Sequence, residues 1–441
     1  MRRAAKSRSA PVEALDAGRI PVGFWAHGQR GARWSNEGVI RLVGFLIEGI
    51  AKDGNFVFRL VLPDWIRDEA EEDLKSLDAV AGRDYTLHSP RDFGLQIEDF
   101  PALVDFANAY VPVEGWLTIF PTFDFAARVE KPLAVVFPDA ILNYFHEFSE
   151  AAWGENGLHY GWDKKVHALV ERADRIVTFS EHVRDQQLVP LFKIPASKVV
   201  VVPHAQPDLA PALPFVRNRT RTDKSLQKAG DILRAHAKER GWSYLHDYPF
   251  EHSTYVAVST QDRVTKNIRV IVDAVLRSIR EDRRDLKILS TAPMHYGAEW
   301  TPLPKYVENH LASRDLISIP DIPRVEHAAF YHCAAVAVHA SIFEGGHAPF
   351  PFSEAVSVGT PCLVAQGPHV AEFCAAEPDM IPFTFDPNDA DQLRALIIDT
   401  IDRRDEVLAI QRKVYERVRR RTWADAAVGY ARAAIEGGLT E

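Results

Sequence analysis

Short apolar runs alternate with stretches of helical periodicity over most of the chain, a pattern typical of α/β proteins with buried parallel strands. The run IPVGFWA at residues 20–26 predicts the first strand, and FVFRLVL at 56–62 predicts the second. Between them a helix is predicted at residues 39–52, where apolar side chains recur on one helical face: Leu42, Val43, Leu46, Ile47 and Ile50. The chain therefore opens with a β-α-β unit, the start of a doubly wound sheet.

The alternation continues in two series that are separated by a different kind of sequence. Residues 209–252 contain Pro211, Pro214, the charged run RNRTRTDK and a polar helix predicted at 226–240, so we expect an interdomain connection there. Further strands are predicted at 116–120, 133–137, 175–179 and 199–202 in the first series, and at 255–258, 286–289, 316–319, 334–338 and 362–365 in the second.

Length and composition agree with two domains. A chain of 441 residues, 46% hydrophobic and 26% charged, exceeds one ordinary core and supplies enough apolar material for two. The predicted division is a tip at residues 1–17, a first Rossmann-like domain at 18–208, the connection at 209–252, a second Rossmann-like domain at 253–418 and a C-terminal segment at 419–441.

Charge and cysteine content exclude several classes of function. A net charge of −9 argues against a general nucleic-acid binder, because no basic stripe is available to neutralise phosphates. The three cysteines lack CxxC spacing, so neither a disulfide framework nor a zinc site is indicated. The basic start has no apolar core and no run of about 18 apolar residues occurs, so we expect neither a signal peptide nor a membrane span. A cytoplasmic protein is expected, with peripheral contact at the inner face of the membrane left open.

The stretch from Ser341 to Ala365, SIFEGGHAPFPFSEAVSVGTPCLVA, carries the first candidate site. A buried strand leads into a Gly/Pro-rich turn, and a helix is expected to begin near Phe352. Such a junction directs backbone N–H groups and the positive end of a helix dipole at one spot, which favours an anion. Two carboxylates frame that spot, Glu344 before the turn and Glu354 in the expected first helical turn. An ordinary surface turn with a dipole-complementing glutamate is the alternative.

A second candidate site follows the strand at 255–258. The sequence QDRVTKN leads into a helix expected near Ile268, so Arg263 and Lys266 lie at a strand-to-helix junction. Arginine offers a bidentate fork and lysine a compact charge, a useful pair for a diphosphate. A solvated basic turn is the alternative.

Together these two motifs resemble the donor site of retaining glycosyltransferases of family 4, which have the GT-B fold. The family places its two glutamates eight positions apart, whereas Glu344 and Glu354 are ten apart, as if two residues were inserted in the turn. The resemblance implies two Rossmann-like domains facing across a cleft, with a final helix, here 422–435, that crosses back to the first domain.

The resemblance also implies roles for these residues. Arg263 and Lys266 would stabilise the departing diphosphate, Glu344 would lie beside the sugar ring, and Glu354 would hold the ribose hydroxyls. The turn residues would bind the donor through backbone N–H groups: Gly345, Gly346, His347 and Ala348. The departing phosphate would itself take the acceptor proton, so neither a protein nucleophile nor a metal is expected.

The first half resembles the family's acceptor-side domain more loosely. Asp139 ends the strand at 133–137, where it would face the acceptor, but Pro138 replaces the family's usual histidine. A turn or cap role for Asp139 is equally supported. Gly38 is what remains of the family's first Gly-rich loop. His204 follows the strand at 199–202 and is interpreted as structural.

Metal chemistry has little support in the sequence. The DxD sequence, Asp389-Ala390-Asp391, opens a helix after Pro387 and is better explained by N-capping and complementing of the dipole. The seventeen histidines include no HExxH motif. No cofactor or metal is expected, and the nucleotide sugar is a substrate.

The resemblance thus implies a metal-independent retaining glycosyltransferase. It would move a hexose, with mannose as first choice, from a nucleoside-diphosphate sugar to a glycan or lipid-linked acceptor, in the synthesis of bacterial surface polysaccharide. Two alternatives remain: a nucleotide-sugar epimerase or hydrolase of the same fold, and a non-catalytic nucleotide-sugar-binding protein. No nucleic-acid partner is expected, and the oligomeric state is not predicted.

Overall fold

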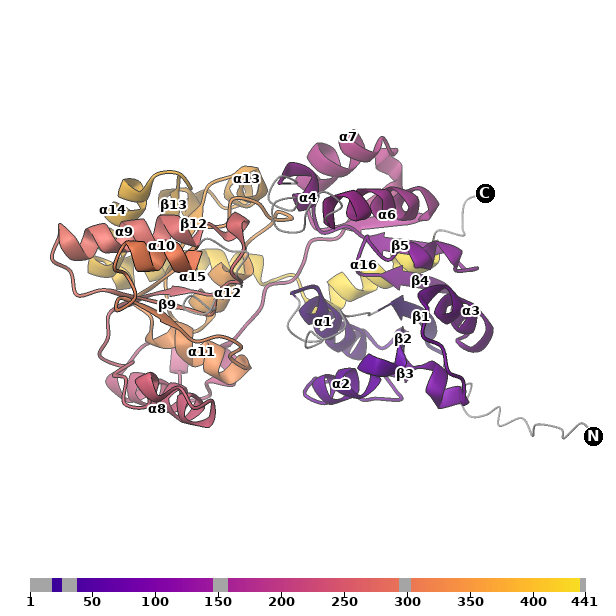
Figure 1. Cartoon of the computed structure of the whole chain (residues 1–441), viewed down its shortest axis with the longest axis horizontal. Helices are drawn as coiled ribbons and strands as arrows, with labels where there is room; N and C mark the ends of the chain where they lie inside the picture. Colours follow the sequence, from indigo (N-terminus) through magenta and orange to yellow (C-terminus); the bar gives the residue numbers. More distant parts are fainter. Residues whose placement is uncertain (1–17, 26–37, 146–157, 293–302, 437–441) are drawn as a thin grey trace, which may run out of the picture. The chain divides into compact units, whose positions relative to one another are not determined.

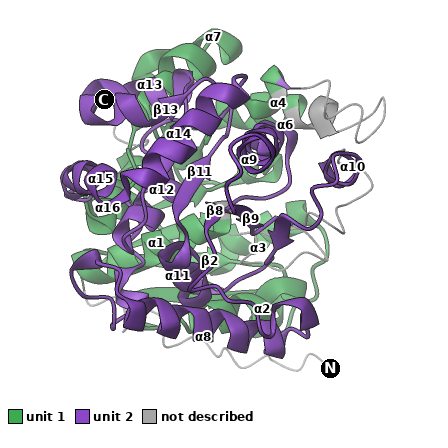
Figure 2. Ribbon diagram, turned by 90° about the vertical axis from the view of Figure 1, so that its left-hand side faces the viewer, with its two compact units in different colours: residues 1–144, 155–204, 421–441 green, residues 145–154, 205–420 purple. Residues whose placement is uncertain are grey.

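The computed structural model describes residues 18–25, 38–145, 158–292 and 303–436 (Figure 1). The chain divides into two compact units, coloured separately in Figure 2. Unit 1 comprises residues 1–144, 155–204 and 421–441, and unit 2 comprises residues 145–154 and 205–420. Each unit is built on a parallel sheet, so the predicted pair of Rossmann-like α/β domains is confirmed.

Unit 1 contains a sheet whose described strands number seven, in the order β3-β2-β1-β4-β5-β6-β7. All six strand pairings are parallel. Alternate side chains of these strands enter the two apolar layers of the unit. The strands are β1 (Ile20–Trp25), β2 (Phe56–Val61), β3 (Tyr85–His88), β4 (Gly115–Thr118), β5 (Leu133–Val136), β6 (Arg175–Thr178) and β7 (Val199–Val201).

Helices cover the two faces of this sheet. The helix predicted at 39–52 is α1, and its recurring apolar residues are buried in one of the two layers. The described helices of unit 1 are α1 (Gly38–Asp53), α2 (Asp64–Leu74), α3 (Phe100–Tyr110), α4 (Ile141–Tyr144), α6 (Leu158–Arg172), α7 (Val189–Phe192) and α16 (Trp423–Ile435).

The last helix, α16, packs in unit 1 beside α1, far from it in sequence (Figure 1). Thr422 starts it with a capping box to Asp425, which satisfies backbone N–H groups of the first turn. His204 is buried, and its Nε2 lies 2.7 Å from the Tyr430 hydroxyl of α16. The predicted C-terminal helix on the first domain is therefore confirmed, and the contact with Tyr430 agrees with the structural interpretation of His204.

Replacing Gly49 of α1 with alanine should destabilise the protein by about 1–3 kcal/mol, the usual cost of overpacking. A Cβ at position 49 would lie 2.2 Å from the Trp423 carbonyl oxygen, and backbone moves less easily than a side-chain tip. Gly44→Ala in the same helix is the control, because its Cβ would meet only the Leu77 side chain, at 3.3 Å. Chemical denaturation of both variants measures the difference. Equal stability of the two would contradict the close packing of α16 on α1.

Unit 2 contains a sheet of six described strands in the order β10-β9-β8-β11-β12-β13, again with all pairings parallel. The strands are β8 (Tyr255–Val258), β9 (Lys287–Ser290), β10 (Leu316–Ser318), β11 (Val336–His339), β12 (Cys362–Ala365) and β13 (Thr384–Phe385). Its described helices are α8 (Asp223–Glu239), α9 (Ile268–Arg280), α10 (Leu303–Asn309), α11 (Arg324–Cys333), α12 (Phe350–Ser357), α13 (Pro368–Ala376), α14 (Ala390–Asp402) and α15 (Arg404–Val418).

Residues 209–252, predicted as an interdomain connection, lie within unit 2. Their helix α8 packs on α11 through a narrow apolar face that includes Ala229 and Leu233. Arg221, just before the helix, donates hydrogen bonds to the carbonyls of Cys333 and Ala334. The charged residues of α8, which contributed to the prediction of a connection, lie mostly on its solvent side.

Candidate functional site

The two sequence motifs of the second half follow adjacent strands of unit 2. β8 and β11 pair in parallel at the centre of the sheet. The strand order reverses between them, since β9 and β10 lie beyond β8 whereas β12 and β13 lie beyond β11. Ligands of open α/β sheets bind beyond the carboxyl ends of strands at such a switch point. The fold therefore brings both motifs to the position where a ligand is expected.

The loop after β8 carries the two predicted cations. Arg263 is exposed and precedes a short 3-10 helix, Val264–Lys266, in which Lys266 is half-buried. Asn267 then takes a left-handed conformation, with φ 48°, and α9 starts at Ile268 as predicted. The Thr265 carbonyl accepts a 2.9 Å hydrogen bond from the Ile342 N–H, which ties this loop to the one after β11.

The loop after β11 holds Glu344 and the Gly-rich turn. Gly346 and His347 both have positive φ, 83° and 76°, which reverses the chain before α12. The Ala348 N–H bonds to Nδ1 of His347 at 2.8 Å, so this predicted donor-binding N–H already has a partner within the turn. Gly345 is buried, whereas Gly346 and His347 are intermediate in exposure.

Lys266 and Glu344 form an ion pair between the two loops. The side chains are 20% and 31% exposed, so the pair lies at the surface edge of the site and not in the core. Burial is the largest single influence and opposes ionisation of Glu344, but its neighbours together, Lys266 first among them, lower the pKa of Glu344 to about 2. Glu344 is therefore a carboxylate at neutral pH, and the predicted proximity of the two motifs is present in the structure.

Glu354 occupies a different environment from the one expected. The helix α12 begins at Phe350 after Pro349, so Glu354 is its fifth residue and the expected first-turn position is wrong. The prolines at 349 and 351 explain the shift, because proline suits the cap and first turn of a helix. Glu354 is only 2% exposed. Its Oε2 lies 3.5 Å from the Tyr331 hydroxyl, which donates to it, and 3.9 Å from His327 Nε2.

Sequence reasoning missed the partners that α11 and β11 supply. His327 also contacts the Ser259 hydroxyl after β8, at 2.8 Å. His339 ends β11 and is 7% exposed, with its Nε2 at 3.6 Å from Glu344 Oε1. Burial lowers the pKa of His339 to about 4, so its imidazole is neutral at pH 7. The available signal was a polar residue at the end of an otherwise apolar run.

The predicted residues of the first half lie in unit 1. Asp139 follows β5, and its Oδ1 accepts a 3.0 Å hydrogen bond from the Ile141 N–H at the start of α4. This contact matches the cap role considered for Asp139. Gly38 is the first residue of α1, and the loop before it falls outside the described residues.

The DxD sequence acts as predicted at the start of α14. Asp389 accepts hydrogen bonds from the N–H groups of Asp391 and Gln392, which confirms it as the N-cap. Asp391 forms an ion pair with Arg277 at 2.6 Å. Among the described residues no group of three or more His, Cys, Asp or Glu side chains is arranged to hold a metal ion.

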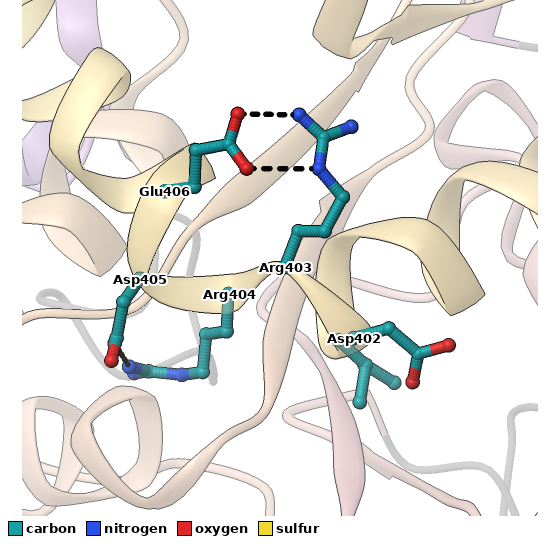
Figure 3. Close-up of a pocket in the computed structure, with 6 residues that line it drawn as sticks. Asp402, Arg403, Arg404, Asp405 and Glu406 are labelled. Atoms are coloured by element: carbon teal, nitrogen blue, oxygen red, sulfur yellow. Dashed lines mark hydrogen bonds and ion pairs between the residues drawn. The ribbon is translucent and has the colours of Figure 1, made fainter.

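A separate surface hollow lies where α14 meets α15 and is lined by residues 401–406 (Figure 3). Its two arginines are matched by acids of the same turn, Arg403 by Glu406 and Arg404 by Asp405. None of the predicted site residues lines this hollow. Its charges are balanced locally, so we assign it no ligand.

No protein-family model matches the chain, and neither does any curated protein. Solved structures do match it over nearly its whole length, at low identity. The N-terminal domain of Candida albicans trehalose-6-phosphate phosphatase is 12% identical, with a TM-score of 0.62 and coverage of 96% of this chain and 97% of that one. Sucrose-phosphate synthase from Thermosynechococcus elongatus is 14% identical, with a TM-score of 0.62 and coverages of 93% and 97%.

A third match is Anabaena HepE in complex with UDP-glucose, at 11% identity, a TM-score of 0.62 and coverages of 94% and 98%. These likenesses establish the GT-B fold of the chain. Within the described residues no helix is both long and apolar enough to cross a membrane.

Proposed function

We propose that the protein is a glycosyltransferase that uses a nucleoside-diphosphate sugar bound at the switch point of unit 2. The observation that carries this proposal is the Lys266–Glu344 pair, which joins a cation and a carboxylate from two loops 78 residues apart. A diphosphate needs cations, and a sugar ring that develops positive charge is stabilised by a nearby carboxylate. The fold supports the same activity, because HepE of this fold binds UDP-glucose.

The chemistry follows from these groups. The bond between the anomeric carbon and the phosphate oxygen breaks, and Lys266 and Arg263 stabilise the negative charge that collects on the diphosphate. The acceptor oxygen bonds to the anomeric carbon from the same face, and its proton passes to the departing phosphate. The configuration is then retained, no protein nucleophile is needed and no metal is used. Glu344 lies beside the sugar, and Glu354 holds the ribose.

We further propose family 4 membership, a hexose donor with GDP-mannose as first choice, and a glycan or lipid-linked acceptor of bacterial surface polysaccharide. The Arg-x-x-Lys-Asn sequence at residues 263–267 resembles that of bacterial mannosyltransferases, which supports the mannose assignment. We propose a cytoplasmic location, with peripheral contact at the inner face of the membrane left open.

A thermal-shift panel of GDP-mannose, UDP-glucose and their free nucleoside diphosphates tests the proposal. A ligand at 100 times its Kd should stabilise the protein by about 2.7 kcal/mol. The absence of a shift with every member would overturn the donor site. Incubation without acceptor then separates the alternatives, because formation of an epimer would favour an epimerase, and binding without turnover a binding protein.

Asp139→Asn should lower transfer to the acceptor by about ten- to a hundredfold, the worth of a hydrogen bond to a charged group, while leaving donor binding unchanged. Asparagine caps about as well as aspartate, so α4 should be preserved. Asp174→Asn is the matched control, because its carboxylate accepts the Leu133 N–H at 2.8 Å, at the opposite end of β5. Equal transfer rates in the two variants would leave Asp139 with a cap role only.

A further inference from the structure

His339 is a buried histidine whose Nε2 has no hydrogen-bond partner in the described structure. It is 7% exposed and ends β11, in the centre of the sheet. A buried polar atom without a partner costs free energy that most native structures avoid. Because His339 lies beside a proposed ligand site, we expect its Nε2 to gain a hydrogen-bond partner in another state of the protein.

The same carboxylate oxygen of Glu344 faces both His339 and Lys266. Oε1 bonds to Lys266 Nζ, while His339 Nε2 lies 3.6 Å from that oxygen, slightly beyond hydrogen-bond range. At longer range His339 also faces His369 of α13 and Glu354 of α12. A change of a few tenths of an ångström in the Glu344 side chain would bring the imidazole N–H into bonding distance.

When a diphosphate binds, Glu344 needs a new hydrogen-bond donor, and His339 can provide it. The proposed function requires Lys266 to turn its ammonium toward the phosphates, and Glu344 then loses its counter-ion. A carboxylate that is two-thirds buried loses much of its stabilisation when its partner leaves. His339 is the adjacent donor, and its neutral imidazole can donate from Nε2 without adding a second charge.

We infer that His339 is a positioning residue. It replaces Lys266 as the hydrogen-bond donor to Glu344 when Lys266 moves to the donor diphosphate. The inference rests on the proposed function for the identity of the ligand. Lys266 holds Glu344 in the free protein, and His339 holds it in the donor-bound protein. The exchange keeps the carboxylate ionised and fixed beside the sugar while the lysine charge is used elsewhere.

The exchange can be tested without ligand by a double-mutant cycle on stability. Lys266→Met keeps the aliphatic stem but removes the ammonium, so His339 should become the donor to Glu344. His339→Leu should then leave the Tm of the wild type unchanged or slightly higher, and clearly lower the Tm of Lys266→Met. Additive effects of the two substitutions would overturn the exchange, whatever the substrate proves to be.

Donor binding gives the second test. In the wild-type background His339→Leu should weaken binding of the nucleoside diphosphate by about ten- to a hundredfold, the worth of a hydrogen bond to a charged group. His339→Gln should restore most of the affinity, because its amide N–H can reach the position of Nε2, whereas His339→Asn should not. Wild-type affinity in His339→Leu would overturn the inference, and so would a Gln variant as weak as Leu.

His332→Leu is the matched control. His332 is also fully buried in unit 2, but both its ring nitrogens have partners, the Ser225 hydroxyl at 2.9 Å and the Val358 carbonyl at 2.7 Å. Its replacement should lower the Tm and leave diphosphate affinity unchanged, the reverse of His339→Leu. If no nucleoside diphosphate binds the wild type, the proposed function fails while the stability cycle still decides the coupling.

Discussion

Replacing Lys266 with alanine is expected to lower kcat/KM for the nucleotide sugar by about a hundred- to a thousandfold. The reason is that the ammonium acts on charge that grows in the transition state, where loss of one preorganised donor typically costs about 3 kcal/mol. Most of the loss should appear in kcat, because the phosphate carries less charge at the breaking bond in the ground state. Steady-state kinetics with the donor identified by thermal shift measure the effect.

A matched lysine separates this role from the loss of an ion pair as such. Lys287 pairs with Asp315 at 2.5 Å, and the two side chains have similar exposure, 30% and 23%. Lys287 is the first residue of β9, so it lies at the amino-terminal ends of the strands, opposite the candidate site. Lys287→Ala should change Tm as Lys266→Ala does and leave turnover near that of the wild type. Arg263→Ala should resemble Lys266→Ala. Near-normal turnover in both site variants would remove the diphosphate assignment.

The sheets were predictable wherever strands are fully buried. Each predicted strand corresponds to an observed one within a few residues, because buried parallel strands are continuous apolar runs. β3 was missed since YTLH is only partly buried and mixes polar with apolar residues, and β13 because it is two residues long. The caps at Asp389 and Thr422 were predictable, since capping depends on local sequence.

The contact between Lys266 and Glu344 has a different basis. The residues belong to two motifs whose proximity depends on β11 pairing with β8 instead of with β10, the strand that precedes it along the chain. Only a doubly wound strand order makes them neighbours. The resemblance implied that the two motifs lie together, and the sheet order supplies the physical cause of their contact.

The surroundings of Glu354 could not be predicted from periodicity. His327 and Tyr331 are one turn apart on α11, a helix that was not predicted from the sequence, and both reach the carboxylate. A helical period identifies which residues are buried but not which polar groups are buried together. His339 was not predicted as part of the site for the same reason, because a single histidine at the end of a strand is not part of a periodic pattern.

Glu344→Gln and Glu354→Gln should separate into a kcat effect and a KM effect. Glu344 is in contact with Lys266, where charge changes during reaction, so loss of its charge should lower kcat by about a hundredfold. Glu354 is proposed to hold the ribose, a contact made equally in the ground and transition states, so its loss should raise the donor KM by about ten- to a hundredfold with kcat little changed.

Glutamine is the informative substitution because Glu354 is 2% exposed. Alanine would leave a cavity and deprive the Tyr331 hydroxyl of its acceptor, a loss of about 2–5 kcal/mol that could hide any effect on binding. Glutamine keeps the volume and an acceptor oxygen, and removes only the charge. Tyr331→Phe is the control, since it removes the hydroxyl contact and leaves the carboxylate in place.

The two possible roles of Glu354 then give opposite results. If it binds ribose, Glu354→Gln raises KM for the nucleotide sugar and the Kd of the free nucleoside diphosphate in parallel, and Tyr331→Phe changes both much less. If it only joins α11 to α12, Glu354→Gln and Tyr331→Phe lower Tm by similar amounts and leave KM unchanged. An exchange of the kcat and KM effects between Glu344 and Glu354 would mean that the two extra residues of the turn have exchanged the roles of the two carboxylates.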